Sequence, residues 1–140
     1  MNPLMKLGVA GHVKLYRSTK GRRGGQIQGM QVLLITTVGR KSGEARTVPL
    51  VCIEHEGKRV IAASVGGAPN HPAWFLNMEA NPAVTVELGE DQYEAVARVT
   101  EGDERALLWD KMVEAGKFFA GYQLKTSRLI PVIVLEPAAR

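Results

Sequence analysis

The chain has 140 residues, of which 45% are hydrophobic and 23% are charged, with a net charge of +4. This size and composition predict one domain with a single core. No apolar run approaches the ~20 residues that a membrane-spanning helix needs, and the N-terminus lacks the apolar core of a signal peptide. The single cysteine, Cys52, excludes a disulfide within the chain and fits a reducing compartment. We therefore expect a cytoplasmic protein.

Positive charge is concentrated in the first part of the chain. Residues 1–60 contain 11 Lys and Arg against 3 Asp and Glu, whereas residues 61–140 contain 7 against 11. A basic half of this kind suggests an anionic partner, which could be a nucleic acid, an anionic lipid or a charged small molecule. A nucleic-acid-binding module is disfavoured, because the aromatic residues are not interleaved with the basic stretch.

The first predicted element is an amphipathic helix over residues 4–17. Apolar side chains recur at helical spacing on one side and cations on another. The apolar members are Met5, Val9, Val13 and Tyr16, and the cations are Lys6, Lys14 and Arg17. The pattern predicts a helix that packs on its own domain, or one that touches the inner face of a membrane peripherally.

A buried strand and a basic loop follow. Residues 31–38 are a nearly continuous apolar run with β-branched side chains, which is typical of a buried strand. The next loop offers an anion three cations and a hydroxyl, from Arg40, Lys41, Ser42 and Arg46. Arginine can grip a phosphate or carboxylate with two hydrogen bonds. The loop is not a Walker A motif, because the earlier glycine and the following helix are missing. A solvated charged hairpin is the alternative.

A hairpin is predicted next, from residues 45–55 and 58–65. Pro49 cannot donate a ladder hydrogen bond, so it indicates an edge or a bulge in the first of these strands. Cys52 and His55 are predicted to point to opposite faces of that strand, so they do not form a nucleophile–base pair. No two of the three histidines have metal-ligand spacing on one element, and we expect no metal site.

The stretch 64–77 is the centre of the expected site. Strand-like sequence leads into the Gly-Gly pair at 66–67, where the backbone can approach a ligand closely or adopt positive φ. Pro72 suits the first turn of a helix, whose free N–H groups and partial positive charge suit an anion. Trp74 and Asn77 are three residues apart and share one face of that helix. An aromatic plate and an amide are thus expected beside a glycine loop, with burial of Trp74 in the core as the alternative.

The rest of the chain completes the predicted sheet. Residues 82–88 and 91–99 alternate apolar and polar side chains around a turn, which predicts a second hairpin. Residues 103–115 are expected to be a helix, 117–123 a helix or a lid loop, and 130–135 a final strand. About six strands joined mostly by hairpins, with a few short helices, predict a mainly β fold: one small, antiparallel closed or split barrel.

Two long motifs resemble signatures of the deazaflavin-dependent nitroreductase family. The first signature resembles the run LLITTVGRKSG at 33–43, and the second resembles GGAPNHPAWFLN at 66–77. The family's closing strand resembles residues 130–137. The resemblance extends in the same order and spacing from about residue 15 to the C-terminus, and two long motifs together are far more specific than a lone glycine loop.

The resemblance implies a split β-barrel that binds coenzyme F420, an 8-hydroxy-5-deazaflavin with a phosphate and an oligoglutamate tail. It implies hydride transfer from the reduced deazaflavin to a small acceptor such as a quinone, a nitroaromatic or an activated enone or lactone. The residues matched to the anionic tail and phosphate are Arg40, Lys41, Ser42 and Arg46. Those matched to the ring side are Ser64, Val65, Gly66, Gly67, Pro72, Trp74 and Asn77. Ser64 and Tyr122 would be catalytic, Tyr122 matching one of a set of tyrosines over the substrate.

Two departures from the family pattern leave the substrate open. Many members carry lysine after the serine, where this chain has Val65, and some carry further tyrosines where it has Gly116 and Phe119. The alternatives are an FMN-using split-barrel oxidoreductase, a deazaflavin enzyme acting on biliverdin or a fatty acid, and a carrier that binds F420 or lipid without turnover. The sequence does not distinguish a monomer from a dimer.

Overall fold

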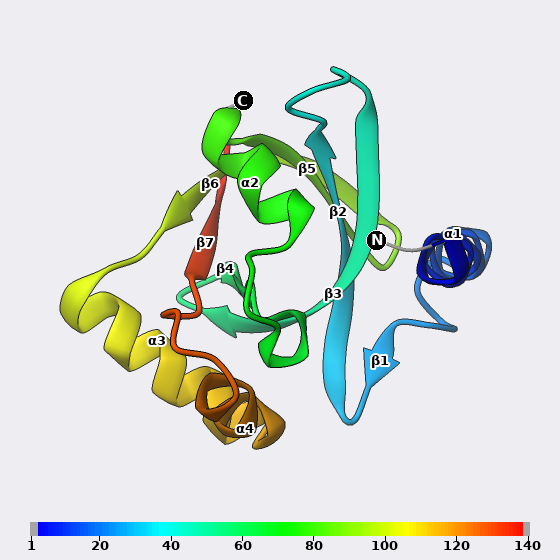
Figure 1. Ribbon diagram of the computed structural model, residues 1–140. Helices are drawn as coiled ribbons and strands as arrows, with labels where there is room; N and C mark the ends of the chain where they lie inside the picture. Colours follow the sequence, from blue (N-terminus) through cyan, green and yellow to red (C-terminus); the bar gives the residue numbers. More distant parts are fainter. Residues whose placement is uncertain (1–2, 139–140) are drawn as a thin grey trace.

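The computed structural model describes residues 3–138 (Figure 1). The elements of this range are α1 (Pro3–Ser18), β1 (Gln26–Ile27), β2 (Met30–Val38), β3 (Ala45–His55), β4 (Lys58–Ala62), the 3₁₀ helix η1 (Val65–Gly67), α2 (Ala73–Ala80), β5 (Ala83–Leu88), β6 (Asp91–Val99), α3 (Gly102–Ala115), α4 (Phe118–Leu124) and β7 (Val132–Pro137). The strands expected at 31–38, 45–55, 82–88 and 91–99 are present with nearly the same bounds.

Six strands close into an antiparallel barrel in the order β2-β3-β4-β7-β6-β5, and β5 returns to pair with β2. The predicted mainly β, antiparallel split-barrel fold is confirmed. β1 pairs with β2 outside the barrel; the sequence did not predict it, because two residues carry no periodicity. Pro49 pairs with Leu34 of β2, in the part of β3 that has no described strand on its other side, so the predicted edge position is confirmed.

Side chains alternate between two cores along the strands. Ile61 of β4 and Ile133 and Leu135 of β7 are fully buried inside the barrel. Their neighbours Val60 and Val134 point the other way and pack in a second cluster under α3 and α4. The period of two along a strand thus divides these apolar side chains between the barrel interior and the helical layer.

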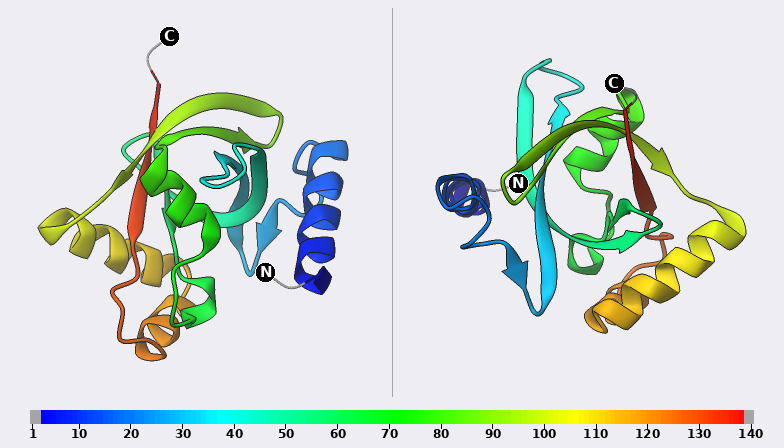
Figure 2. Two further views of the ribbon diagram at one scale, coloured as in Figure 1. Left: turned by 45° about the horizontal axis from the view of Figure 1, so that its top comes forward. Right: turned by 180° about the vertical axis from the view of Figure 1, so that it is seen from behind.

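The segment between β4 and β5 crosses one end of the barrel. β4 lies between β3 and β7, whereas β5 lies between β6 and β2, so the chain must pass from one side to the other. η1 and α2 make this crossing, and Figures 1 and 2 show α2 over the barrel opening with η1 beside α4. β4 is shorter than the predicted 58–65, because the chain turns out of the sheet before Ser64 to begin the crossing.

α1 lies on the outside of the barrel, beside β2 and β3 (Figure 1). Val13 and Tyr16 are buried there against Leu34, so the helix predicted over 4–17 packs on its own domain. Its solvent-facing side is not purely polar, because Leu4 and Leu7 are 81% and 72% exposed. Among the described helices, none is long and apolar enough to cross a membrane.

The Tyr16 hydroxyl bridges the place where β2 and β5 separate. It donates to the Val32 carbonyl oxygen at 3.0 Å and accepts a hydrogen bond from the Gly89 N–H at 2.8 Å. The β2–β5 ladder covers residues 34–36 of β2, so the phenol satisfies backbone groups beyond the ladder. Burial raises the pKa of the Tyr16 phenol, which keeps the hydroxyl protonated as a donor.

Replacing Tyr16 with phenylalanine is expected to lower the free energy of unfolding by roughly 1–3 kcal/mol, because buried backbone groups lose their partner. Denaturant unfolding measures the difference. Tyr93→Phe is the control, since the Tyr93 ring is partly buried against the barrel-interior cluster and no described residue hydrogen-bonds its hydroxyl. Equal losses in the two variants would contradict the bridging role.

Candidate functional site

Asn77 ties α2 to the β2–β3 loop. Its Oδ1 accepts hydrogen bonds from the backbone N–H of Arg40 (3.2 Å) and from Arg40 Nη1 (3.1 Å), while its Nδ2 donates to Thr37 Oγ1 (3.1 Å). Asn77 and Thr37 are both buried. One amide therefore holds together the two stretches predicted to form the site, 39–46 and 64–77. Contact between Asn77 and a cofactor stays a prediction.

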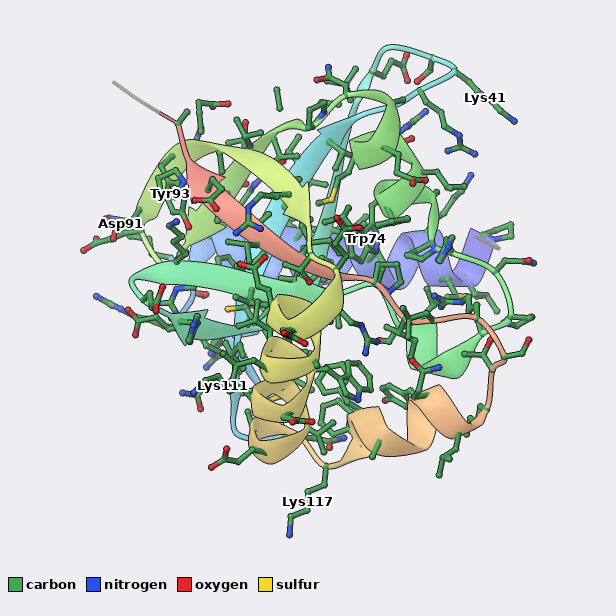
Figure 3. All side chains as sticks on the ribbon, turned by 90° about the vertical axis from the view of Figure 1, so that its left-hand side faces the viewer. Lys41, Trp74, Asp91, Tyr93, Lys111 and Lys117 are labelled. Atoms are coloured by element: carbon green, nitrogen blue, oxygen red, sulfur yellow. The ribbon has the colours of Figure 1, made fainter. Side chains whose placement is uncertain are left out.

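The β2–β3 loop presents cations to solvent. Lys41 is exposed and extends outward from the loop (Figure 3), with no hydrogen bond or ion pair to any residue that the structure describes. Arg46 forms an exposed ion pair with Glu44 at 3.3 Å, a kind of contact that stabilises little in water. The Ser42 hydroxyl accepts the Glu44 N–H at 3.1 Å and so shapes the turn. The lysine and Arg46 are therefore available to an anion.

The loop after β4 keeps several donors available. Val65, Gly66 and Gly67 have φ angles of 45°, 62° and 85°, so three consecutive residues lie in the left-handed region. The N–H groups of Val65 and Gly66, and the hydroxyl of the buried Ser64, make no hydrogen bond to another described residue. Successive backbone N–H groups in such a turn form a concave surface that suits an anion or a polar ring edge.

Gly67 lets α4 approach this loop backbone to backbone. A Cβ at Gly67 would lie 2.6 Å from the carbonyl oxygen of Tyr122 and 3.1 Å from its Cα. Tyr122 is half-buried, with its ring near those of Phe118 and Phe119. The structure thus brings the segments that carry Ser64 and Tyr122 into contact, as the proposed pair of catalytic residues requires, although their catalytic roles stay predictions.

The structure buries Trp74. The residue is 9% exposed and belongs to the barrel cluster, where its ring meets Phe75 edge-on with centroids 6.5 Å apart. Figure 3 shows it in the interior of the molecule. Pro72 lies immediately before α2 as its N-cap, with extended backbone. Trp74 is therefore a core residue, as the alternative interpretation of the sequence held, because α2 closes the barrel end. A contact between Trp74 and a cofactor stays a prediction.

Sequence analysis missed Arg128, in the segment between α4 and β7. Its guanidinium donates to the carbonyl oxygens of Ala63, Ser64 and Ala68 at 2.9–3.0 Å, and Nη1 lies 3.0 Å from His71 Nδ1. Burial lowers the pKa of the Arg128 guanidinium, which still remains protonated. No sequence pattern signals such a residue, since three of its acceptors are main-chain groups at least 60 positions away.

Two surface hollows lie away from these residues. One, of about 790 Å³, is lined by Arg59, Asp91 and Tyr93 among others. The second, of about 560 Å³, is lined by the glycine-rich loop 21–29 and Gln31. Figure 3 shows Asp91 and Tyr93 on the opposite side of the molecule from Lys41. Neither hollow includes a residue of the candidate site, so the site is distinct from both.

The reactive groups at the site are hydroxyls, amides and cations. Cys52 is buried in the barrel core, and burial raises the pKa of its thiol, which makes it a poor nucleophile. Within residues 3–138 there is no cluster of three His, Cys, Asp or Glu side chains that could hold a metal ion.

A six-stranded antiparallel barrel crossed at one end by a helix places the chain in the split-barrel class. The structure of HutZ, the heme storage protein of Vibrio cholerae, matches with a TM-score of 0.62 over 94% of this chain and 92% of that chain. At 16% identity this likeness concerns the fold alone.

Closer matches identify the family. The profile of the F420H(2)-dependent quinone reductases matches residues 9–137, and the chain belongs to that family. It is 36% identical over 128 residues to an F420H(2)-dependent quinone reductase of Mycobacterium tuberculosis, covering 89% of this chain and 86% of that one. The solved F420-H2 dependent reductase FDR-A is 47% identical with a TM-score of 0.70, over 75% of this chain and 93% of that one. A solved structure described as a domain-swapped dimer is 40% identical with a TM-score of 0.73, and the match covers 91% of this chain and 96% of that chain.

Proposed function

We propose that this chain is an F420H2-dependent oxidoreductase that reduces quinones. The observation that carries the proposal is the tie made by Asn77, which joins a cation-rich loop to the helix that follows a glycine loop. F420 has a polyanionic tail and a flat ring. The tail suits the exposed cations of residues 40–46, and the ring suits a loop whose glycines permit close approach of the backbone.

The residues present fit this cofactor. Lys41 has no partner in the described part of the chain, and the two side-chain partners of Arg46, Glu44 and Ser42, are both exposed. Both cations can therefore turn to a phosphate or carboxylate at little cost. On the ring side, the N–H groups of Val65 and Gly66 and the Ser64 hydroxyl make no hydrogen bond to another residue of the described range, so they can donate to a ligand. When bound, the reduced deazaflavin supplies the hydride; the chain binds it, orients it and excludes water.

Ser64 and Tyr122 are proposed to stabilise the reduced acceptor. A quinone that has accepted a hydride carries negative charge on oxygen, which needs hydrogen-bond donors and a proton. The Ser64 hydroxyl has no partner among the described residues, and α4 holds Tyr122 against the same loop through Gly67. Either hydroxyl can donate to that oxygen, and water can deliver the proton. No strong general base is needed.

Replacing Tyr122 with phenylalanine is expected to lower kcat by about 5- to 10-fold, less than the loss of a sole proton donor would cause, because Ser64 or water can substitute. The Kd for F420 should hardly change, since the ring and its packing are retained. Steady-state kinetics with several quinones measures both quantities. Unchanged rates with every acceptor would remove Tyr122 from the reaction.

Val65→Lys is expected to tighten F420 binding by up to roughly 5-fold, the scale of one exposed ion pair. Val65 is 45% exposed, so a longer side chain can be accommodated in solvent. Val65→Gly is the matched control: it relieves a β-branched residue at positive φ without adding charge. Fluorescence titration at low and high salt measures the effect. Equal gains in both variants would show that strain, and not the missing cation, limits affinity.

The test of the proposed function is a titration followed by an acceptor screen. The purified protein is titrated with oxidised F420, FMN and single-stranded DNA, and F420 is expected to bind tightest. Reduced F420 is then supplied with quinones, nitroaromatics, enones and lactones, while the absorbance of the oxidised deazaflavin is followed. Turnover of quinones is expected, and turnover of the other classes would extend the substrate range. FMN binding as tight as F420 would contradict the proposal, and F420 binding without turnover would indicate a carrier.

A peripheral membrane contact of α1 is a second proposal, which the exposed side of the helix supports. Leu4, Leu7 and Leu15 are 81%, 72% and 42% exposed, and Lys6 and Lys14 lie on the same helix. Apolar side chains flanked by cations suit an anionic lipid surface. Co-sedimentation with anionic vesicles should fall for a Leu4→Ser, Leu7→Ser double variant. A wild-type dimer that this variant dissociates, with no vesicle binding, would assign the leucines to a second copy.

A further inference from the structure

We propose that Arg128 is a positioning residue that fixes the glycine loop and places a positive charge behind it. The charge part rests on the proposed use of F420, whereas the loop part does not. The Arg128 cluster consists of this arginine, its three carbonyl acceptors on Ala63, Ser64 and Ala68, and the imidazole of His71.

The contacts of Arg128 bracket the loop from both ends. Nη1 and Nη2 bond the carbonyl oxygens of Ala63 and Ser64, at 3.0 and 2.9 Å, where the chain leaves β4. Nε bonds the carbonyl oxygen of Ala68 at 2.9 Å, just beyond the positive-φ residues. A planar guanidinium can satisfy several acceptors in fixed directions, which a lysine ammonium cannot reproduce. One side chain therefore sets the distance between the two ends of the loop.

Arg128 is itself held in place. Gln123 Nε2 donates to the Arg128 carbonyl oxygen at 2.8 Å, and Gln123 Oε1 accepts the Ile130 N–H at 3.0 Å. The backbone N–H of Arg128 also donates to Thr126 Oγ1, at 3.3 Å. The arginine is thus anchored to α4, the helix that carries Tyr122 and that meets the loop at Gly67. Both proposed catalytic residues are consequently positioned by one connected set of contacts.

The positive charge of Arg128 has no described counter-ion. None of the ion pairs formed by residues 3–138 involves it, and its four acceptors are neutral carbonyl groups and a His71 nitrogen that accepts in its unprotonated form. A half-buried cation without a carboxylate raises the local positive potential. That potential favours an anionic ligand at the loop, where the side chain of Val65 supplies no charge.

The 8-hydroxyl of the deazaflavin provides a spectroscopic report on this charge. The hydroxyl is a phenol-type acid, and its ionisation changes the absorbance of the ring. A nearby cation stabilises the ionised form and therefore lowers the pH at which the bound ring titrates. Loop order, by contrast, is measured in the cofactor-free protein, by amide hydrogen exchange of the peptide that contains residues 63–71.

The experiment compares Arg128→Met, Arg128→Lys and the control Arg105→Met. Arg105 is also a half-buried arginine that bonds one backbone carbonyl, that of Ile130, but it packs over Trp109 and has no described contact with the glycine loop. Without cofactor, both Arg128 variants should speed exchange in the loop peptide by roughly 10-fold or more, the scale expected when hydrogen bonds to a charged group are lost. The control should leave this peptide unchanged.

With F420, Arg128→Met should raise Kd by about 10- to 100-fold and shift the titration of the bound ring to higher pH. In Arg128→Lys, the bound ring should titrate at the wild-type pH, because the charge is kept, while amide hydrogen exchange in the loop peptide should remain fast. Unchanged exchange in Arg128→Met would overturn the positioning role, and an unchanged titration would overturn the charge role. If wild type does not bind F420, the proposed function fails, but the exchange comparison still decides whether Arg128 positions the loop.

Discussion

Replacing Trp74 with alanine is expected to lower the free energy of unfolding by about 3–5 kcal/mol, the usual cost of truncating a buried aromatic residue. Trp74 is 9% exposed and is part of the interior cluster of the barrel. Its truncation would leave a cavity beneath α2, the helix that closes the barrel end, and would remove the edge-on contact with Phe75. Denaturant unfolding followed by circular dichroism measures the loss.

Trp74→Ala should also weaken F420 binding, because it disturbs the geometry of the candidate site. Asn77, one turn along α2, holds Arg40, so a shift of the helix moves the cation-rich loop. Trp109→Ala is the matched control, because Trp109 is a half-buried tryptophan at the edge of the other cluster, away from α2. We expect a smaller loss of stability and unchanged F420 affinity for that control. A Trp74→Ala protein that keeps its stability and loses only affinity would show that the ring serves the cofactor directly.

The orientation of Trp74 illustrates what the sequence could not provide. α2 has eight residues, and Trp74, Phe75, Asn77 and Met78 are all buried, so the helix lacks a polar side that would mark its direction. A three-residue spacing correctly places Trp74 and Asn77 near each other on the helix. It cannot reveal that the surface they share faces the barrel. That fact depends on the crossing from β4 to β5, which is a property of the whole topology.

The parts that were predictable have local causes. The hairpin of residues 82–99 follows from the alternation of apolar and polar side chains. Both hairpins follow from turn residues, at Glu56–Gly57 and Gly89, which adopt positive φ as such turns require. The cations of the β2–β3 loop can be read directly from the sequence. Asn77 and Arg128 are different, because their partners lie 37 to 65 positions away and are mostly backbone atoms. Long-range hydrogen bonds to main-chain groups leave no periodicity in the sequence. Only the folded structure therefore shows that Asn77 holds the β2–β3 loop and that Arg128 holds the glycine loop.

The second large effect is expected at the tip of the β2–β3 loop. Lys41→Ala should raise the Kd for F420 by roughly 2- to 100-fold, depending on whether the ammonium grips the phosphate or follows the flexible glutamate tail. Lys41 is the cleaner position to test, because it has no partner among residues 3–138, whereas Arg40 also bonds Asn77. Lys117→Ala is the matched control: it removes an exposed cation from the far end of the molecule (Figure 3).

Salt and tail length separate the two cases for Lys41. Ion pairs in solvent are screened at high ionic strength, so the loss caused by Lys41→Ala should shrink as salt is added if the lysine follows the tail. A charge-assisted hydrogen bond to the phosphate should resist salt. If Lys41 contacts the glutamate tail, an F420 analogue without glutamates should bind the wild type less tightly, and Lys41→Ala should weaken its binding less than that of F420. If Lys41 contacts the phosphate, neither change is expected. If neither salt, nor tail length, nor Lys41→Ala changes the affinity relative to Lys117→Ala, the loop is a solvated hairpin and the anionic end of the cofactor lies elsewhere.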